Sequence, residues 1–215
     1  MMNLFTVFDP CTGFFSLNWL SIFFVFFFFP LHFWFCNNSL ICFLNRFLFF
    51  FYNEISNLTV YFNSILFFIS FFIFIMILNV VGLVPYVFTC SSHLVFSLGL
   101  GLPIWLGLMI FGWLSKSNHM FIHMVPVGTP FFLMPFMVMI ESISNFIRPF
   151  SLAVRLSANM IAGHLLMSLL GESSEGVFLM IFFFVFLIIF VFELAVSFIQ
   201  SYVFVTLSVL YSSEV

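Results

Sequence analysis

Charged residues are rare in this chain, and three of them recur at a regular spacing within an apolar stretch. Glu141, Arg148 and Arg155 stand seven residues apart. At about 100° per residue of an α-helix, they lie within about 40° of one another on one face. The same face also carries small and polar residues: Ser144, Ser151, Ala158, Asn159 and Ala162. The spacing predicts a narrow polar stripe along an otherwise apolar helix.

A second apolar stretch carries a similar stripe, made of Glu193, Ser197 and Gln200. These three residues also share one face of a helix. Polar stripes on two paired helices can line a path that water reaches. The sequence therefore predicts a polar path between two apolar helices.

The residue types of these stripes divide into groups that exchange protons and groups that do not. The carboxylates of Glu141 and Glu193 and the imidazole of His164 can gain and lose a proton, whereas a guanidinium keeps its charge. We therefore expect proton movement, with Arg155 as a fixed positive charge facing a carboxylate of another subunit. The alternative is that Arg155 pairs with Glu141, or with an acid distant in the sequence, and only fixes helix packing.

The composition places these helices in a membrane. The chain has 215 residues, of which 65% are hydrophobic and 5% are charged, whereas soluble domains carry about 25% charged residues. At about 20 apolar residues per crossing, the apolar residues suffice for five or six helices in one membrane domain. With a formal net charge of -3 and no basic patch, a nucleic acid partner is excluded. We predict an all-α membrane protein.

No residue pattern indicates a metal, a cofactor or a site for ATP. The four cysteines, of which Cys11 is the first, show no C-x-x-C spacing, so neither a zinc site nor a disulfide framework is predicted. The only lysine, Lys116, does not follow a G-x-x-x-x-G loop, so no P-loop exists. We expect no cofactor and no catalytic site of the chain's own.

The first 130 residues are predicted to hold three crossings and one interfacial helix. The crossings are expected at residues 14–35, 60–84 and 94–114, whereas residues 41–52 are too short to cross. Arg46 and Lys116 then fall on one side and Asp9 on the other, so the positive-inside rule places the N-terminus on the outer face. Residues 115–130 are rich in proline and glycine near their end and are expected to form an irregular loop.

Residues 131–170 and 176–212 form two apolar stretches that only the sequence GESSE separates. A helix of 40 residues is about 60 Å long, so it fits a hydrocarbon core of about 30 Å only when steeply tilted. Pro149 can kink the first stretch without reversing it. We favour two long, steeply tilted helices in a C-terminal hairpin over the alternative, in which each stretch breaks into two ordinary crossings.

Several motifs resemble one known family. The stretch from Ile147 to Gly171, IRPFSLAVRLSANMIAGHLLMSLLG, resembles the signature of subunit a of F-type ATP synthases in its animal mitochondrial form. The likeness extends to MMNLFTVFDP at the start, NVVGLVPYVFT at 79–89, HMVPVGTP at 123–130 and IQSYVFVTLSVLYSSEV at the end. It covers nearly the whole chain and is weakest at residues 41–70. The resemblance implies a proton-translocating stator subunit.

The resemblance also implies roles for residues that match the family's motifs. Arg155 matches the arginine that faces the proton-carrying carboxylate of the rotating c-ring and keeps two half-channels apart. Asn159 and Gln200 match polar neighbours of that arginine.

His164 and Glu193 match the pair that lines the half-channel open to the intermembrane space. Glu141 and Glu214 match acids on the matrix side. The implied partners are the c-ring, other membrane and peripheral-stalk subunits, lipid and protons. The implied location is the mitochondrial inner membrane, crossed several times.

Two other functions compete with this expectation. A secondary transporter could use Arg155 to bind an anion, but such proteins usually contain internal repeats, and the first half of the chain holds no counterpart of the charged hairpin. An inert membrane scaffold would have no use for buried arginines, each of which costs at least about 2.5 kcal/mol in mid-membrane.

Overall fold

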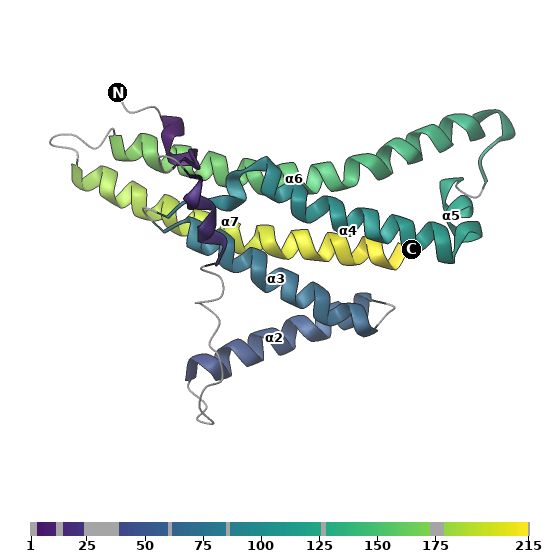
Figure 1. The fold of residues 1–215 in the computed structure, drawn as a ribbon, viewed down its shortest axis with the longest axis horizontal. Helices are drawn as coiled ribbons and strands as arrows, with labels where there is room; N and C mark the ends of the chain where they lie inside the picture. The colour runs from purple at the N-terminus through teal and green to yellow at the C-terminus, as the bar shows by residue number, and fades with distance from the viewer. Residues whose placement is uncertain are drawn as a thin grey trace.

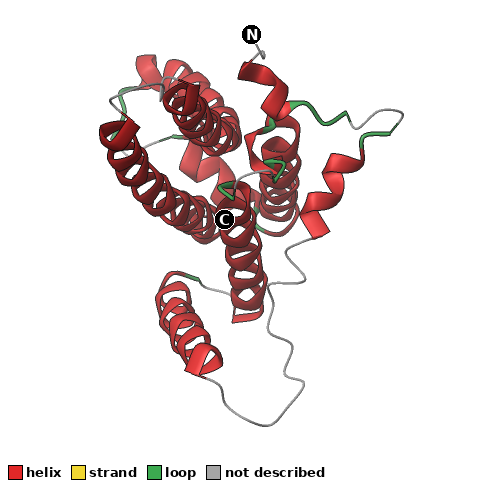
Figure 2. Ribbon diagram, turned by 90° about the vertical axis from the view of Figure 1, so that its left-hand side faces the viewer, coloured by secondary structure: helices red, strands yellow, loops and turns green. Residues whose placement is uncertain are grey.

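The computed structural model describes residues 4–11, 15–23, 39–59, 62–84, 87–125, 128–172 and 179–214. Every regular element within these ranges is a helix (Figure 2). The all-α fold class is therefore confirmed. The α-helices are α2 (Ser39–Leu58), α3 (Phe62–Gly82), α4 (Leu94–Ser115), α5 (Ser117–Met124), α6 (Met134–Glu172) and α7 (Leu179–Glu214). Short 3-10 helices are η1 (Leu4–Phe8), η2 (Leu17–Phe23), η3 (Cys90–Ser92) and η4 (Phe131–Leu133).

The helices α6 and α7 are the longest elements and lie side by side in opposite directions (Figure 1). They contain 39 and 36 residues, which corresponds to about 58 Å and 54 Å at 1.5 Å per residue. The helix α6 passes through Pro149 without a break and bends near its middle (Figure 1). A proline inside a helix removes one hydrogen bond and favours such a bend. The long hairpin is confirmed, and the alternative of four shorter crossings is wrong.

Within the described residues, four helices are long and apolar enough to cross a membrane: α3, α4, α6 and α7. The helices α3 and α4 confirm the crossings predicted at residues 60–84 and 94–114. The prediction for residues 14–35 falls mainly on residues outside the described ranges, and its described part contains the 3-10 helix Leu17–Phe23. The chain is a multi-pass membrane protein.

Glycine allows a close approach between α4 and α6 at one position. A Cβ on Gly101 would lie 3.7 Å from the backbone oxygen of Pro149. Gly99 and Gly107, on the same helix, face open space. Small residues let helix backbones approach in lipid, and here Gly101 brings α4 against the bend of α6.

The helix α2 is longer than predicted. It contains 20 residues instead of about twelve, because the polar residues after Tyr52 continue the helix. It is not among the four apolar candidates for a crossing, and it lies at the edge of the bundle (Figures 1 and 2). Phe51 anchors it, with its ring 4.3 Å from that of Phe72 on α3 and 5.8 Å from that of Tyr202 on α7.

Part of the stretch expected to be an irregular loop is helical. The helix α5 occupies Ser117–Met124 within residues 115–130. Its residues include neither proline nor glycine, and the breakers begin only at Pro126. The backbone oxygen of Lys116 accepts hydrogen bonds from the amides of His119 and Met120 at the start of this helix. The prediction of a loop was therefore wrong for these eight residues.

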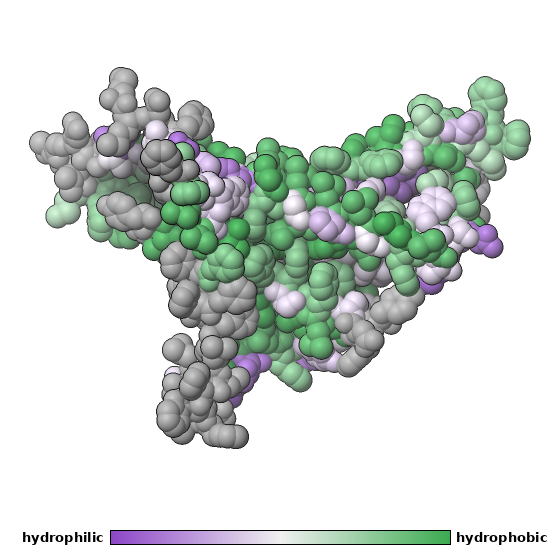
Figure 3. Space-filling view, in the orientation of Figure 1, coloured by the Kyte–Doolittle hydropathy of each residue, from purple (hydrophilic) through white to green (hydrophobic). Residues whose placement is uncertain are grey.

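A hydrophobic core joins α2 and α3 to the hairpin. Its buried members on the hairpin are Leu152 and Leu156 of α6 and Phe204, Val205 and Val209 of α7. Outside this core, apolar side chains cover most of the face seen in Figure 3, and hydrophilic residues gather toward the ends of the long helices. Such a surface suits a lipid environment.

The N-terminal segment is fastened to the connection between α3 and α4. The hydroxyl of Ser21 hydrogen-bonds with the thiol of Cys90 at 2.8 Å. The ring of Trp19 lies 5.7 Å from that of Phe88 and 5.2 Å from that of His93. The 3-10 helices η1 and η2 therefore lie beside the end of the bundle where α6 ends (Figure 1).

Candidate functional site

The polar stripe of α6 divides into two parts with different surroundings. Near its beginning, Glu141 and Arg148 are half-buried between helices. Farther along, the stripe is exposed at the surface of the chain. We call this exposed part the Arg155 face, which consists of Ser151, Arg155, Ala158, Asn159 and Ala162.

An ion pair joins Glu141 and Arg148, which lie two turns apart on α6. Their nearest charged atoms, Oε1 and Nη2, lie 3.7 Å apart. The guanidinium of Arg148 also lies over the ring of Tyr211 on α7, 5.1 Å from its centre. Arg148 thus links the start of α6 to the end of α7, while Glu141 pairs with Arg148 instead of with Arg155.

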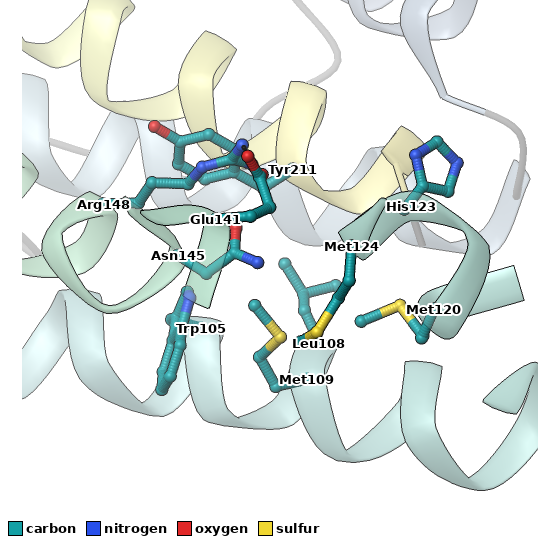
Figure 4. Close-up of a pocket in the computed structure, with 10 residues that line it drawn as sticks. All are labelled: Trp105, Leu108, Met109, Met120, His123, Met124, Glu141, Asn145, Arg148 and Tyr211. Atoms are coloured by element: carbon teal, nitrogen blue, oxygen red, sulfur yellow. Dashed lines mark ion pairs between the residues drawn. The ribbon is translucent and has the colours of Figure 1, made fainter. Parts of the chain in front are cut away.

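The Glu141–Arg148 pair borders a cavity of about 240 Å³ between α4, α5, α6 and α7 (Figure 4). Figure 4 shows polar side chains of α6 and α7 on one side and methionines of α4 and α5 on the other. Asn145 could have been found from the sequence, because it follows Glu141 by one turn of the same helix. Tyr211 and His123 also line the cavity but belong to other elements, which spacing alone does not bring together.

Arg155 lies near the middle of α6 and is exposed. Among the residues that the structure describes, none forms an ion pair or hydrogen bond with its guanidinium. Its neighbours on the Arg155 face are small or polar and not lipid-like. The guanidinium is therefore open to approach from the surface of the described part of the chain.

Asn159 and Gln200 connect the hairpin helices directly. The side-chain amide of Asn159 donates a hydrogen bond of 3.0 Å to the Oε1 atom of Gln200. Gln200 is buried, whereas Asn159 belongs to the exposed Arg155 face. The two residues that sequence reasoning placed near Arg155 are therefore in contact with each other, one helical turn from Arg155.

Glu193 is buried against α6. Its side chain is 8% exposed, and its carboxyl group lies directly over Gly163, where a Cβ would come within 2.8 Å of Oε1. Sequence reasoning missed Gly163, because the need for a glycine here arises only from the packing of α7. The stripe of α7 packs against α6, where Glu193 lies over Gly163 and Gln200 accepts the hydrogen bond of Asn159.

His164 lies beside a larger cavity, of about 670 Å³, near the end of α6. Its Nε2 atom is buried and has no hydrogen-bond partner in the described part of the chain. The histidine lies against the backbone of Gly82, at the end of α3, and its ring meets that of Phe8 edge-on at 6.2 Å. The resemblance pairs His164 with Glu193, but in the described part of the chain no hydrogen bond connects the two side chains.

The two cavities lie at opposite ends of the hairpin with a packed section between them. From Arg148 to His164 the helix advances 16 residues, or about 24 Å. Leu152, Leu156 and Met160 are buried along this section. Arg155 lies roughly halfway, and Glu214 is the last residue of α7. The arrangement offers, at each end of the hairpin, a largely apolar recess that contains a few polar and titratable side chains, with one fixed charge between the two recesses.

Comparison with known proteins gives one consistent result. The family model described as ATP synthase A chain matches residues 15–213. "ATP synthase subunit a" of Anopheles gambiae is 49% identical over 224 residues, which cover 100% of this chain and 99% of the relative. The proteins of that name from Drosophila yakuba and Drosophila melanogaster are 49% and 48% identical over 222 residues, with the same coverage.

Proposed function

This chain belongs to the ATP synthase A chain family, and we propose that it moves protons through two half-channels. The proteins of this family are the membrane component of ATP synthase that translocates protons. In this proposal, each half-channel reaches a rotating ring of c subunits from one side of the membrane. Arg155 lies between them. The two recesses at the ends of the hairpin, each with titratable side chains in its lining, support this arrangement.

The observation that carries the proposal is the exposed Arg155 face. A guanidinium in mid-membrane costs at least about 2.5 kcal/mol on insertion scales and does not escape by losing its proton. Arg155 has no partner among the described residues, so a carboxylate from another subunit is the partner that its charge demands. The small residues Ala158 and Ala162 would let a neighbouring helix approach closely.

Each recess then serves one side of the membrane. Protons enter through the cavity beside His164, pass Glu193 and neutralise a carboxylate of the c-ring. The ring carries them round, and they leave past Glu141 and Glu214 on the matrix side. Arg155 repels protons that would cross directly between the half-channels, and Asn159 and Gln200 hold the adjoining helix surfaces together.

We place the chain in the mitochondrial inner membrane with its N-terminus toward the intermembrane space. Arg46 and Lys116 then lie on the matrix side, as the positive-inside rule requires. The names of the insect relatives support other ATP synthase subunits as its partners, and in this proposal those partners include the c-ring and the peripheral stalk. The chemistry of ATP belongs to those partners, and this chain supplies only the proton path.

The test replaces Arg155 by alanine in the assembled ATP synthase. We expect Arg155→Ala to abolish ATP-driven proton pumping in proteoliposomes while the complex still assembles. Arg46→Ala, which removes an arginine from α2 outside the stripe, is the matched control and should pump normally. Normal pumping by the Arg155 variant would refute the proposal. If the purified chain alone transported an anion, the rival function of a secondary transporter would hold instead.

A further inference from the structure

The cavity beside His164 has a wall that the hairpin does not supply. The N-terminal segment contributes four of its lining residues, which are Thr6, Val7, Asp9 and Asn18. The opposite wall comes mainly from α6 and α7 and includes Ser168 beside His164. A segment far away in the sequence thus completes the recess beside the half-buried imidazole of His164.

Two contacts hold the N-terminal segment in place beside the cavity. The ring of Phe8 meets that of His164 edge-on at 6.2 Å. The hydrogen bond between Ser21 and Cys90 joins η2 to η3. The recess is therefore a built feature of the fold.

Asp9 has a fixed position in this wall. The backbone amide of Cys11 donates a hydrogen bond of 3.2 Å to its Oδ1 atom. The side-chain amide of Asn18 donates one of 3.2 Å to its backbone oxygen. These bonds fix the turn after η1, while the carboxylate remains exposed. Among the described lining residues of this cavity, Asp9 is the only acid.

We infer that Asp9 is the outer proton-collecting group of the path that leads to His164. This inference rests on the proposed function. A proton from the outer solution binds the Asp9 carboxylate and makes it neutral. The proton then passes through water in the cavity to the imidazole of His164, which becomes cationic, and the carboxylate regains its charge.

The chemistry of the recess suits this order of steps. A carboxylate at the mouth of a cleft raises the local concentration of cations and the rate of their arrival. The His164 Nε2 atom is buried and without a hydrogen-bond partner among the described residues, so it is the inner polar group with unmet hydrogen-bonding capacity. Thr6, Asn18 and Ser168 provide neutral polar groups along the same cavity.

The experiment compares acid variants in ATP synthase reconstituted into liposomes and stripped of its catalytic sector. We expect Asp9→Asn to lower passive proton conductance by up to about tenfold. Charge-lined clefts raise the rate at which ions arrive by about 10- to 1,000-fold, and tenfold is the lower end of that range. Asp9→Glu should restore it, because the charge returns. Glu172→Gln is the matched control: it removes an exposed acid at the same end of α6 that does not line the cavity.

The outcomes separate this inference from the function on which it rests. Unchanged conductance in Asp9→Asn, or an equal loss in Glu172→Gln, would overturn the role of Asp9. Glu193→Gln serves as the internal reference, since it should lower conductance whatever Asp9 does. If conductance also persists in Glu193→Gln, the proposed function is overturned, and not only the role of Asp9. Assembly is checked by the subunit composition of each purified complex.

Discussion

The Cα atom of Gly163 on α6 faces the carboxyl group of Glu193 on α7 so closely that no methyl group fits between them. Glu193 is 8% exposed, so its side chain is confined from other directions as well. The glycine next to His164 thus sets where the carboxylate of the other helix lies. Gly163 is a positioning residue for Glu193.

Gly163→Ala should displace the Glu193 carboxyl group and lower passive proton conductance. A misplacement of about 1 Å can cost about 100-fold in a reaction that depends on alignment, which is the upper limit expected here. Alanine also favours helix by about 1 kcal/mol over glycine, so the loss would not come from a weaker helix.

The control for this prediction is Gly107→Ala on α4, where a Cβ meets open space. It should conduct like the parent protein. Proton conductance is measured after reconstitution, together with that of Glu193→Gln. If Gly163→Ala conducted normally while Glu193→Gln did not, the contact would have no positioning role.

The amide pair between the hairpin helices predicts compensation. The combined length of the Asn159 and Gln200 side chains suits the separation of the two helices. Either Asn159→Gln or Gln200→Asn alone changes that length and disturbs the hydrogen bond. Polar contacts between membrane helices are worth about 0.6 kcal/mol on average, so each single variant should lose about threefold in pumping rate. The double variant restores the combined length and should recover most of the rate. If the pumping rate of the double variant fell by as much as the two single variants together, the hydrogen bond would have no direct role.

The stacking of Arg148 on Tyr211 predicts a difference between two substitutions. Tyr211→Phe keeps the ring and should pump like the parent protein. Tyr211→Leu removes the cation–π contact, which is worth about 0.5 to 1 kcal/mol, and loosens the partner of Glu141. ATP-driven acidification of proteoliposomes compares the two. Equal rates would show that Arg148 holds Glu141 without help from the ring.

Cys90 should resist thiol reagents in the native complex. Burial raises the pKa of its thiol, and the hydrogen bond with Ser21 offsets part of that rise. Because the thiolate is the reactive form, a higher pKa means less reaction at neutral pH, and more only as the pH rises. Cys11 is exposed and should react readily with a maleimide. Mass spectrometry before and after denaturation distinguishes the two, and rapid native labelling of Cys90 would show that the N-terminal segment does not cover it.

The sequence allowed the hairpin and its charges to be predicted because their signals are local. An apolar stretch without a polar turn admits no reversal, and the seven-residue spacing of Glu141, Arg148 and Arg155 defines one helix face. Structure added that this face divides into a half-buried part and an exposed part. That division depends on where α4, α5 and α7 pack, which no spacing within α6 encodes.

Other features could not be predicted because they join distant segments. The wall that Asp9 contributes beside His164 links residues more than 150 positions apart, and the ring of Tyr211 reaches Arg148 across the hairpin. Asp9 was interpreted from the sequence only as a sign of membrane orientation. The helix Ser117–Met124 was missed for a different reason. The predicted loop, which contains Pro126 and Gly128, was extended back to residue 115 and so included this helix.

The packed section between the two cavities has an electrical consequence. If water fills both recesses, it carries the potential of each side inward, so the voltage across the membrane falls mainly over the dry layer around Leu152 and Leu156. Each elementary charge that crosses 100 mV exchanges about 2.3 kcal/mol. Arg155 then lies where the electric field is strongest. A variant that lets water into this layer, such as Leu156→Ser, spreads the voltage over a greater depth, so its proton conductance should depend less steeply on an imposed potential.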